Sequence, residues 1–190
     1  MVRAQSRMRC LTMQITFHDP IPTKASKRNV ALFAEELAEE LGYDPEGPIE
    51  NVVSQSGGAI QYRNAVGTRP ESIKVQPDES FKIFLSTLTS MSRDKFTIAH
   101  ELGHFFLHFP IVRAEFPGDG MRAFRWLDDD APEDLKRCEW EANWFAAAFV
   151  MPETTFRELH REGGLANVAN RLGVSMKAAE VRAKSLALPA

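Results

Sequence analysis

Apolar residues recur at two different spacings along the chain, and the change of spacing divides it into regions. Between residues 29 and 41 they follow the i, i+3/i+4, i+7 spacing of a helix that buries one face. A glycine ends this segment, and the Pro- and Gly-containing segment 44–48 predicts a turn. Three short extended segments follow at residues 59–63, 72–75 and 81–86, separated by turn residues. This region therefore predicts one helix and a small antiparallel sheet.

Helical spacing returns after residue 90. One pattern starts near Ser92 and ends before Pro110, and a second opens at residues 130–132 and stops at a Met-Pro pair. The segment 111–131, rich in glycine, proline and charge, predicts a loop between them. After residue 153, short helices around a turn at 173–175 have a helix-turn-helix outline. We expect an α+β fold: a small antiparallel sheet beside a long helix, with a helical C-terminal part.

Composition limits the classes of protein to consider. With 190 residues and 44% hydrophobic content, the chain can bury one core, and a net charge of -3 gives no general attraction to nucleic acid or anionic membranes. The longest apolar run, residues 144–151, is too short to span a bilayer. Two cysteines, Cys10 and Cys138, suit a reducing compartment. We therefore expect a cytoplasmic protein with no membrane partner.

The candidate chemistry lies in the first long helical pattern, as a His-Glu-x-x-His motif. His100 and His104 are four residues apart, so on a helix they share one face and can bind one metal ion. Glu101 can reach a water molecule on that ion and act as its general base. The alternative is two unrelated histidines. Against it, Gly103 in mid-helix indicates close approach of a neighbouring element, and the opposite face of the helix is apolar.

A catalytic zinc site needs a third protein ligand, and two residues are candidates. His108 continues the series, but another full turn carries its side chain away from the same ion, which favours a helix-end or cleft-wall role. Glu139 lies on the second long helix and shares a face with Asn143, so that one can ligate while the other supports a ligand. Glu141 points elsewhere on this helix and is the weaker candidate. Glu139 is therefore the preferred third ligand.

With both motifs in hand, the chain resembles the ImmA/IrrE family of metallo-endopeptidases. The resemblance lies in residues 96–108, around the His-Glu-x-x-His motif, and in residues 139–152, which read Glu-x-Glu-Ala-Asn-x-Phe-Ala-Ala and end in Val-Met-Pro. The segment 165–178 also looks like the short helical end of such proteins. This likeness covers roughly residues 30–186 and implies a zincin-like metallopeptidase domain over residues 26–152 with a packed C-terminal helical extension over 153–190. Residues 1–25 show neither a long apolar run nor a clear amphipathic helix, and we expect an irregular N-terminal tail there.

The resemblance also implies the roles of individual residues and the class of substrate. Zinc would be held by His100, His104 and Glu139, with Glu101 as catalytic base and Asn143 behind a ligand. Other divalent ions such as Mn2+ could occupy the same ligands. Members of this family typically cleave a helix-turn-helix repressor or antitoxin and so relieve repression after stress. The sequence leaves the oligomeric state open.

Substrate contacts are less well defined by the sequence. Tyr62, His108 and Arg125 are candidate donors to the substrate or to the oxyanion, and nothing in the sequence chooses among them. The strand at residues 81–86 could pair with an extended peptide by β-addition.

A second hypothesis is a non-catalytic regulatory protein with structural zinc that binds a repressor partner or DNA. In the last forty residues, six basic side chains are largely offset by four acidic ones, so we do not expect direct nucleic-acid binding.

Overall fold

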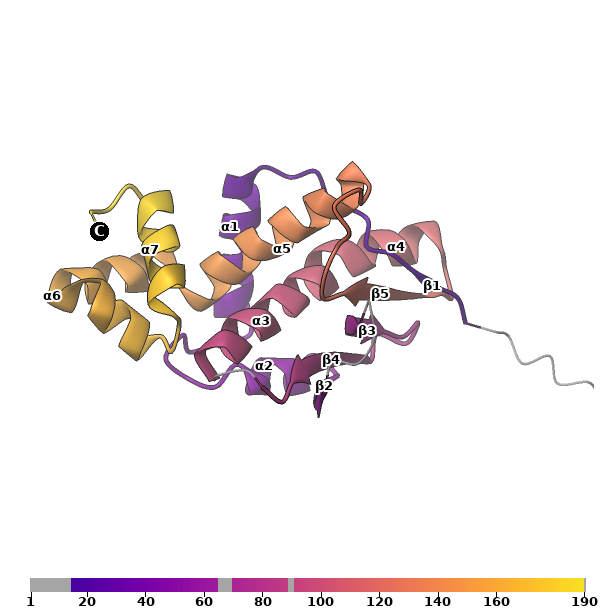
Figure 1. The fold of residues 1–190 in the computed structure, drawn as a ribbon, viewed down its shortest axis with the longest axis horizontal. Helices are drawn as coiled ribbons and strands as arrows, with labels where there is room; N and C mark the ends of the chain where they lie inside the picture. Colours follow the sequence, from indigo (N-terminus) through magenta and orange to yellow (C-terminus); the bar gives the residue numbers. More distant parts are fainter. Residues whose placement is uncertain (1–14, 65–69, 89–90, 190) are drawn as a thin grey trace, which may run out of the picture.

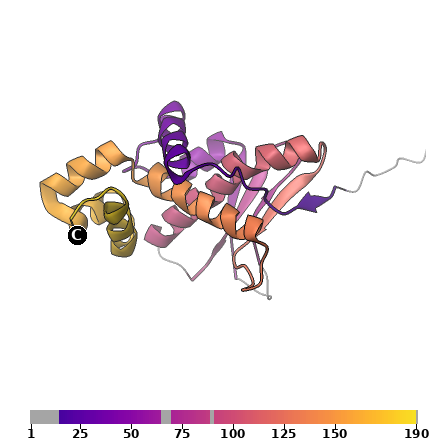
Figure 2. The same cartoon turned by 90° about the horizontal axis from the view of Figure 1, so that it is seen from above.

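The computed structural model describes residues 15–64, 70–88 and 91–189. Over these residues the α+β class is confirmed, with strands gathered toward one end of the molecule and helices α6 and α7 at the other (Figures 1 and 2). Within the same ranges, no helix is long and apolar enough to cross a membrane. Most of the expected N-terminal tail, residues 1–14, lies outside the residues that the structure describes.

The described strands form a five-stranded sheet in the order β1-β5-β3-β4-β2. The strands are β1 (Phe17–His18), β2 (Gly58–Arg63), β3 (Glu71–Val75), β4 (Phe81–Ser86) and β5 (Gly120–Phe124).

The sheet is mixed, which corrects the expected antiparallel meander. β3 pairs antiparallel with β4 and with β5, whereas β2 runs parallel to β4 and β1 runs parallel to β5. The Gln76–Ser80 backbone hydrogen bond closes a tight turn that joins β3 and β4, so this pair is antiparallel. β2, which precedes both strands in the sequence, pairs with the opposite edge of β4. β4 pairs with β3 and β2 over residues 81–83, whereas residues 84–86 pair with β2 and lie beyond the register with β3. β-Addition of a peptide is therefore confined to residues 84–86, where it stays a prediction.

Eight helical segments are assigned within the described ranges. They are α1 (Lys27–Glu40), α2 (Glu50–Gln55), α3 (Met91–Gly103), η1 (His104–His108), α4 (Phe109–Glu115), α5 (Glu133–Val150), α6 (Glu153–Arg171) and α7 (Met176–Ser185). α5 packs against both α1 and α3 (Figure 1). Ser26 caps α1 by accepting a hydrogen bond from the Asn29 N–H, which fixes where this helix starts.

The sequence predicted that the helix carrying the His-Glu-x-x-His motif ends before Pro110. The structure corrects this prediction, because the helical path continues through Pro110. Residues 104–108 form a π-turn, in which the Phe109 N–H donates to the His104 carbonyl, and α4 follows directly. Pro110 therefore lies in the first turn of a new helical segment, where its missing N–H is tolerated. The expected loop 111–131 accordingly contains the rest of α4 and all of β5.

The N-terminal segment is also less irregular than expected. Phe17 and His18 form a strand that pairs with β5, because the extended backbone here lies beside an otherwise open sheet edge. Thr23 then contacts α5 through Glu141.

At the other end of the chain, Gly163 and Gly164 break α6 into two helices, as the expected short helices require. Apolar residues of α6 and α7 belong to the same buried core as the sheet and the long helices.

Candidate metal centre

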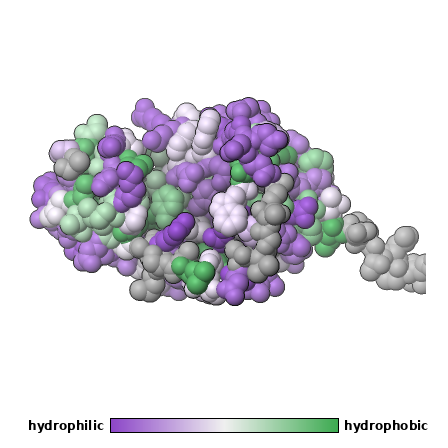
Figure 3. Space-filling model, viewed as in Figure 1, coloured by the Kyte–Doolittle hydropathy of each residue, from purple (hydrophilic) through white to green (hydrophobic). Residues whose placement is uncertain are grey.

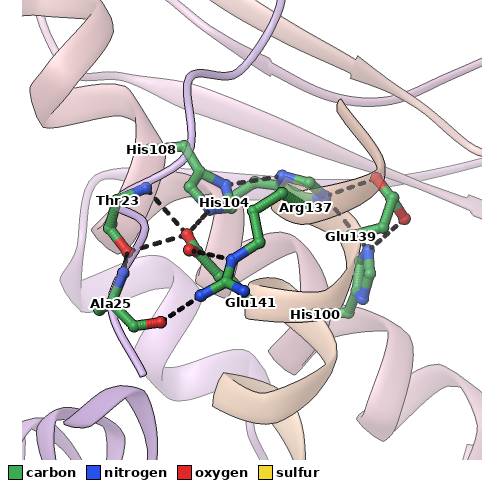
Figure 4. A network of polar contacts seen from close by, with 8 residues as sticks. All are labelled: Thr23, Ala25, His100, His104, His108, Arg137, Glu139 and Glu141. Carbon is green, nitrogen blue, oxygen red and sulfur yellow. Dashed lines mark hydrogen bonds and ion pairs between the residues drawn. The ribbon is translucent and has the colours of Figure 1, made fainter. Parts of the chain in front are cut away.

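Three side chains from separate helical segments converge on one point. His100 belongs to α3, His104 opens η1 and Glu139 lies on α5. The two Nε2 atoms of His100 and His104 lie 3.3 and 3.2 Å from the two carboxylate oxygens of Glu139, and 3.2 Å from each other (Figure 4). The group can hold a metal ion, since its three ligand atoms all lie within 4.8 Å of one another. These are the ligands expected from the sequence.

Close packing of α3 on α5 brings the ligands together. A Cβ atom at Gly103 would lie 3.1 Å from the Ala142 Cα and 3.2 Å from a ring carbon of Phe145. A side chain at this position would therefore require α5 to shift by a few tenths of an ångström. The small residues at 103 and 142 keep Glu139 within reach of both imidazoles.

The protonation of these ligands suits a divalent cation. Burial lowers the pKa of His104 to about 4, so its imidazole is neutral at physiological pH. Burial tends to raise the pKa of Glu139, but its contacts with His100 and His104 outweigh burial and lower it, so the carboxylate is ionised. Two imidazoles and one carboxylate are the donor set of a catalytic metal site with an open position.

Glu101 lies beside this centre and is almost fully buried, with 3% of its surface exposed. Burial raises its pKa to about 7, against the opposing effects of His100 and of a hydrogen bond from the Ser72 side chain. Its Oε2 atom has no hydrogen-bond partner within the described residues. Such an unsatisfied buried atom is costly. Glu101 also lines the cavity beside His100 and Glu139, so its carboxyl group borders the space that a water molecule on a bound ion would occupy.

Ser72 is a site residue that sequence reasoning missed. The register between β3 and β5 shifts between Glu71 and Ile73, so Ser72 sits at an irregularity of the strand. Both Ser72 and Ile73 are buried, which regular alternation along a strand does not give. No pattern in the sequence predicts this shift.

A cavity of about 480 Å³ opens beside His100, Glu101 and Glu139. Arg125 lines it, with its guanidinium donating to the Phe84 carbonyl at 2.7 Å, so this candidate donor is well placed for a substrate. Tyr62 does not line it. Its side chain is 53% exposed on the edge strand β2.

Asn143, expected behind a ligand, has its Oδ1 atom 3.2 Å from His100 Nδ1. An amide oxygen only accepts hydrogen bonds, so Nδ1 of His100 carries the proton and Nε2 is left free to bind a metal.

His108 was a candidate donor to the substrate, but its side chain lies inside the protein, away from the cavity. It is fully buried, its Nδ1 lies 3.0 Å from His104 Nδ1, and its Nε2 lies 3.2 Å from Glu141 Oε2 (Figure 4). Both ring nitrogens are thus engaged inside the protein. This corrects the sequence-based candidacy of His108 as a substrate or oxyanion donor.

Glu141, the weaker ligand candidate, is the anchor of this inner network. Its Oε1 accepts from Arg137 Nε at 2.9 Å, and its Oε2 accepts from the backbone N–H and hydroxyl of Thr23 at 2.9 and 2.8 Å. Arg137 also donates to the Ala25 carbonyl. These donors outweigh burial and lower the pKa of Glu141. One feature of the sequence could have predicted that Glu141 is buried: it lies four residues before Phe145, on the same apolar face of α5.

The inner network fixes the proton positions on two histidines. Ionised Glu141 can only accept hydrogen bonds, so Nε2 of His108 carries the proton of this neutral ring. Nδ1 of His108 is then unprotonated and accepts a hydrogen bond. His104 Nδ1 then donates to it, which leaves His104 Nε2 unprotonated and directed at Glu139. A carboxylate thus orients a metal ligand through an intervening imidazole.

Comparisons with known proteins identify the family of the chain and a structure of similar fold. Residues 72–184 match the family profile of Peptidase M78, described as the IrrE N-terminal-like domain. No curated protein matches the chain. A solved structure described as a Mycobacterium tuberculosis transcriptional regulator is similar, with a TM-score of 0.55 and 15% identity over 80% of this chain and 45% of that chain. The chain thus spans less than half of that regulator's length, and at this identity the likeness shows the fold alone.

Proposed function

The chain belongs to the IrrE N-terminal-like family, Peptidase M78, and from this premise we propose that it is a zinc-dependent endopeptidase. The proposed substrate is a helix-turn-helix transcriptional repressor or antitoxin, whose cleavage relieves repression. The observation that carries the proposal is the convergence of His100, His104 and Glu139 beside the buried Glu101 carboxylate. A cytoplasmic location belongs to the proposal, because such repressors act there.

His100, His104 and Glu139 would hold the zinc ion. When bound, zinc supplies a Lewis acid that polarises the scissile carbonyl and lowers the pKa of a water molecule. Glu101 is the general base: its carboxylate borders the cavity and takes a proton from the attacking water. The same carboxyl group then delivers this proton to the leaving amine nitrogen.

Two further residues assist Glu101. The Ser72 side chain favours the ionised carboxylate, because its hydrogen bond lowers the pKa of Glu101. Arg125 lines the cavity, and because a guanidinium has five N–H donors, it can donate to the developing oxyanion as well as to the Phe84 carbonyl. Any other divalent ion that occupies the ligands would use the same protein groups.

The test is to incubate the metal-loaded protein with candidate helix-turn-helix repressors and to map new termini by mass spectrometry. We expect cleavage that a chelator abolishes. Glu101→Gln should retain the metal, because no ligand is changed, and should cut about 10²–10⁴-fold more slowly, the usual contribution of a general base. Glu133→Gln, at an 82% exposed carboxylate in the first turn of α5, is the matched control.

Unchanged turnover in Glu101→Gln would contradict the assignment of the base. Chelator-insensitive cleavage would contradict the role of the metal. Stable binding of a repressor without any cleavage would instead favour the non-catalytic regulatory protein.

A further inference from the structure

A second and larger cavity adjoins the metal centre. It measures about 1150 Å³ and is lined by residues of α1, α3, α5 and α7, and we call it the α1–α7 groove. Arg93, Phe96, Thr97 and Asn143 line both this groove and the cavity beside Glu101. A peptide that enters the active site can therefore continue along the protein surface into the groove.

The groove offers apolar surface to a ligand. Leu32 on α1 and Val181 on α7 are 49% and 54% exposed, and partly buried Trp144 and Leu186 also line it. Figure 3 shows hydrophobic surface in the hollow between the C-terminal helices and the rest of the molecule. Apolar side chains gathered in one concave surface are typical of a binding site.

The charges around the groove are predominantly positive. Its lining contains five basic residues and two acidic ones, a surplus of three positive charges in a chain whose net charge is -3. The two acids are already paired, Glu35 with Arg182 at 2.7 Å and Glu153 with Arg157 at 2.7 Å.

Three of the basic residues are available to a ligand. Lys27, Arg28 and Arg93 are exposed, and none of them forms an ion pair with another described residue. A ligand that carries carboxylates would complement them.

One wall of the groove is fixed in place by a buried cation. Arg182 on α7 is 5% exposed, donates to the Met151 carbonyl at 3.0 Å and pairs with Glu35 on α1. α7 is therefore held against α1 and the end of α5, so the groove exists before a ligand arrives. A preformed groove binds a flexible peptide at lower entropic cost than one that must assemble.

We propose that the α1–α7 groove binds the part of the peptide substrate adjoining the scissile bond, and that it selects segments combining apolar side chains with carboxylates. The inference rests on the proposed function and names the class of substrate sequence. Continuity with the catalytic cavity supports a peptide, and the unpaired cations support an acidic one. Duplex DNA fits less well, because it has no side chains to cover Leu32 and Val181.

The test uses three fluorescein-labelled synthetic peptides that share one pattern of leucines and carry Glu, Gln or Lys at every other position. Binding to metal-loaded Glu101→Gln is followed by fluorescence anisotropy, so that no peptide is cut. We expect the Glu peptide to bind about tenfold more tightly than the Gln peptide, and the Lys peptide to bind most weakly.

The triple variant Lys27→Glu, Arg28→Glu, Arg93→Glu should reverse this order. The matched control changes Lys82, Arg122 and Arg161 to Glu. These residues are also exposed and lie outside the groove. Because three cations are again replaced by Glu, the control has the same net charge as the groove variant, and it should keep the original order. Metal content and the midpoint of thermal unfolding are measured for both variants, because neither set touches the core.

Equal binding of all three peptides, or an order that the groove variant leaves unchanged, would overturn the proposal. It would also be overturned if the groove variant abolished a concentration-dependent dimer, which would identify a second copy as the occupant. Loss of tight binding to a labelled DNA duplex in this variant would assign the groove to nucleic acid instead.

Failure of the groove and failure of the proposed function have different signatures. If the peptides follow the expected order but the wild-type protein cuts no repressor, the peptide groove stands and the endopeptidase proposal fails. If the protein cuts a proteome-derived peptide library and groove reversal leaves the residues around the cleavage sites unchanged, the groove proposal fails and the enzyme stands.

Discussion

Two clusters of histidine and glutamate lie on the same pair of long helices, and only one of them faces a cavity. In the outer cluster, His100 and Glu139 are 15% and 26% exposed beside the opening. In the inner cluster, His108 and Glu141 have no exposed side-chain surface. His104 belongs to both, since its Nε2 faces Glu139 and its Nδ1 contacts His108.

The clusters differ in how fully their polar atoms are satisfied. Both carboxylate oxygens of Glu141 accept hydrogen bonds, and both ring nitrogens of His108 are engaged. Beside the outer cluster, Glu101 keeps an unpartnered oxygen within the described protein. The same residue types can therefore bind a cation in the outer cluster and orient one of its candidate ligands, His104, in the inner cluster, because only the outer atoms have lone pairs without a hydrogen-bond partner.

The largest expected effect comes from removing an outer carboxylate. Glu139→Ala deletes one of three ligands, and we expect metal affinity to fall by about a thousandfold, as estimated from the total binding energy of protein zinc sites. Isothermal titration calorimetry of the metal-free protein measures this directly. Glu133→Ala, on the first turn of the same helix, should bind metal normally. Retained affinity in Glu139→Ala would mean that another residue completes the site.

The inner cluster should act on the metal through His104, with a smaller effect. Glu141→Gln keeps the side chain's shape but removes the charge that fixes the proton on His108, so metal affinity should fall about 10–100-fold. The nitrogen NMR shifts of His104 should report a changed population of ring tautomers, which a merely structural defect would not produce.

A double-mutant cycle sharpens the comparison. If Glu141 acts only by way of His108, then Glu141→Gln combined with His108→Asn should weaken metal binding no more than the more damaging single change. Additive losses would show instead that the two inner residues act independently, and would break the proposed chain of contacts.

The smallest effect is expected at Ser72. Its hydrogen bond favours the ionised form of Glu101 and so lowers the pKa of this carboxyl group. A base works only when ionised, so hydrolysis falls as the pH drops through that pKa. Ser72→Ala should therefore move the acid limb of the profile of kcat/KM against pH to higher pH, with activity about fivefold lower on that limb. The control Ser80→Ala, in the exposed turn after β3, should leave the limb in place, and a shift to lower pH in Ser72→Ala would contradict the argument.

Much of the fold was predictable because its patterns are local. The extended segments 59–63, 72–75 and 81–86 agree with β2, β3 and β4 to within one residue, since turn residues mark their ends. The helix expected at residues 29–41 is α1, and Met-Pro correctly predicted the end of α5.

The parts that sequence reasoning missed depend on distant partners. β1 pairs Phe17 with Gly120, and neither short strand has enough alternation to be recognised alone. The chain after Pro110 stays helical because a π-turn precedes the proline, and no residue pattern predicts that turn.

The sequence by itself determined the pairing of His100 with His104, because residues four apart on a helix share a face whatever surrounds them. It also favoured Glu139 over Glu141 as the third ligand, because side chains two positions apart on a helix point in different directions. Only the tertiary structure decided how the two glutamates are held. The packing of Gly103 on Ala142 brings Glu139 to the imidazoles, while Thr23, 118 residues away along the chain, holds Glu141 inside. Residue spacing could not predict the contact with Thr23, because it depends on a segment remote in the sequence.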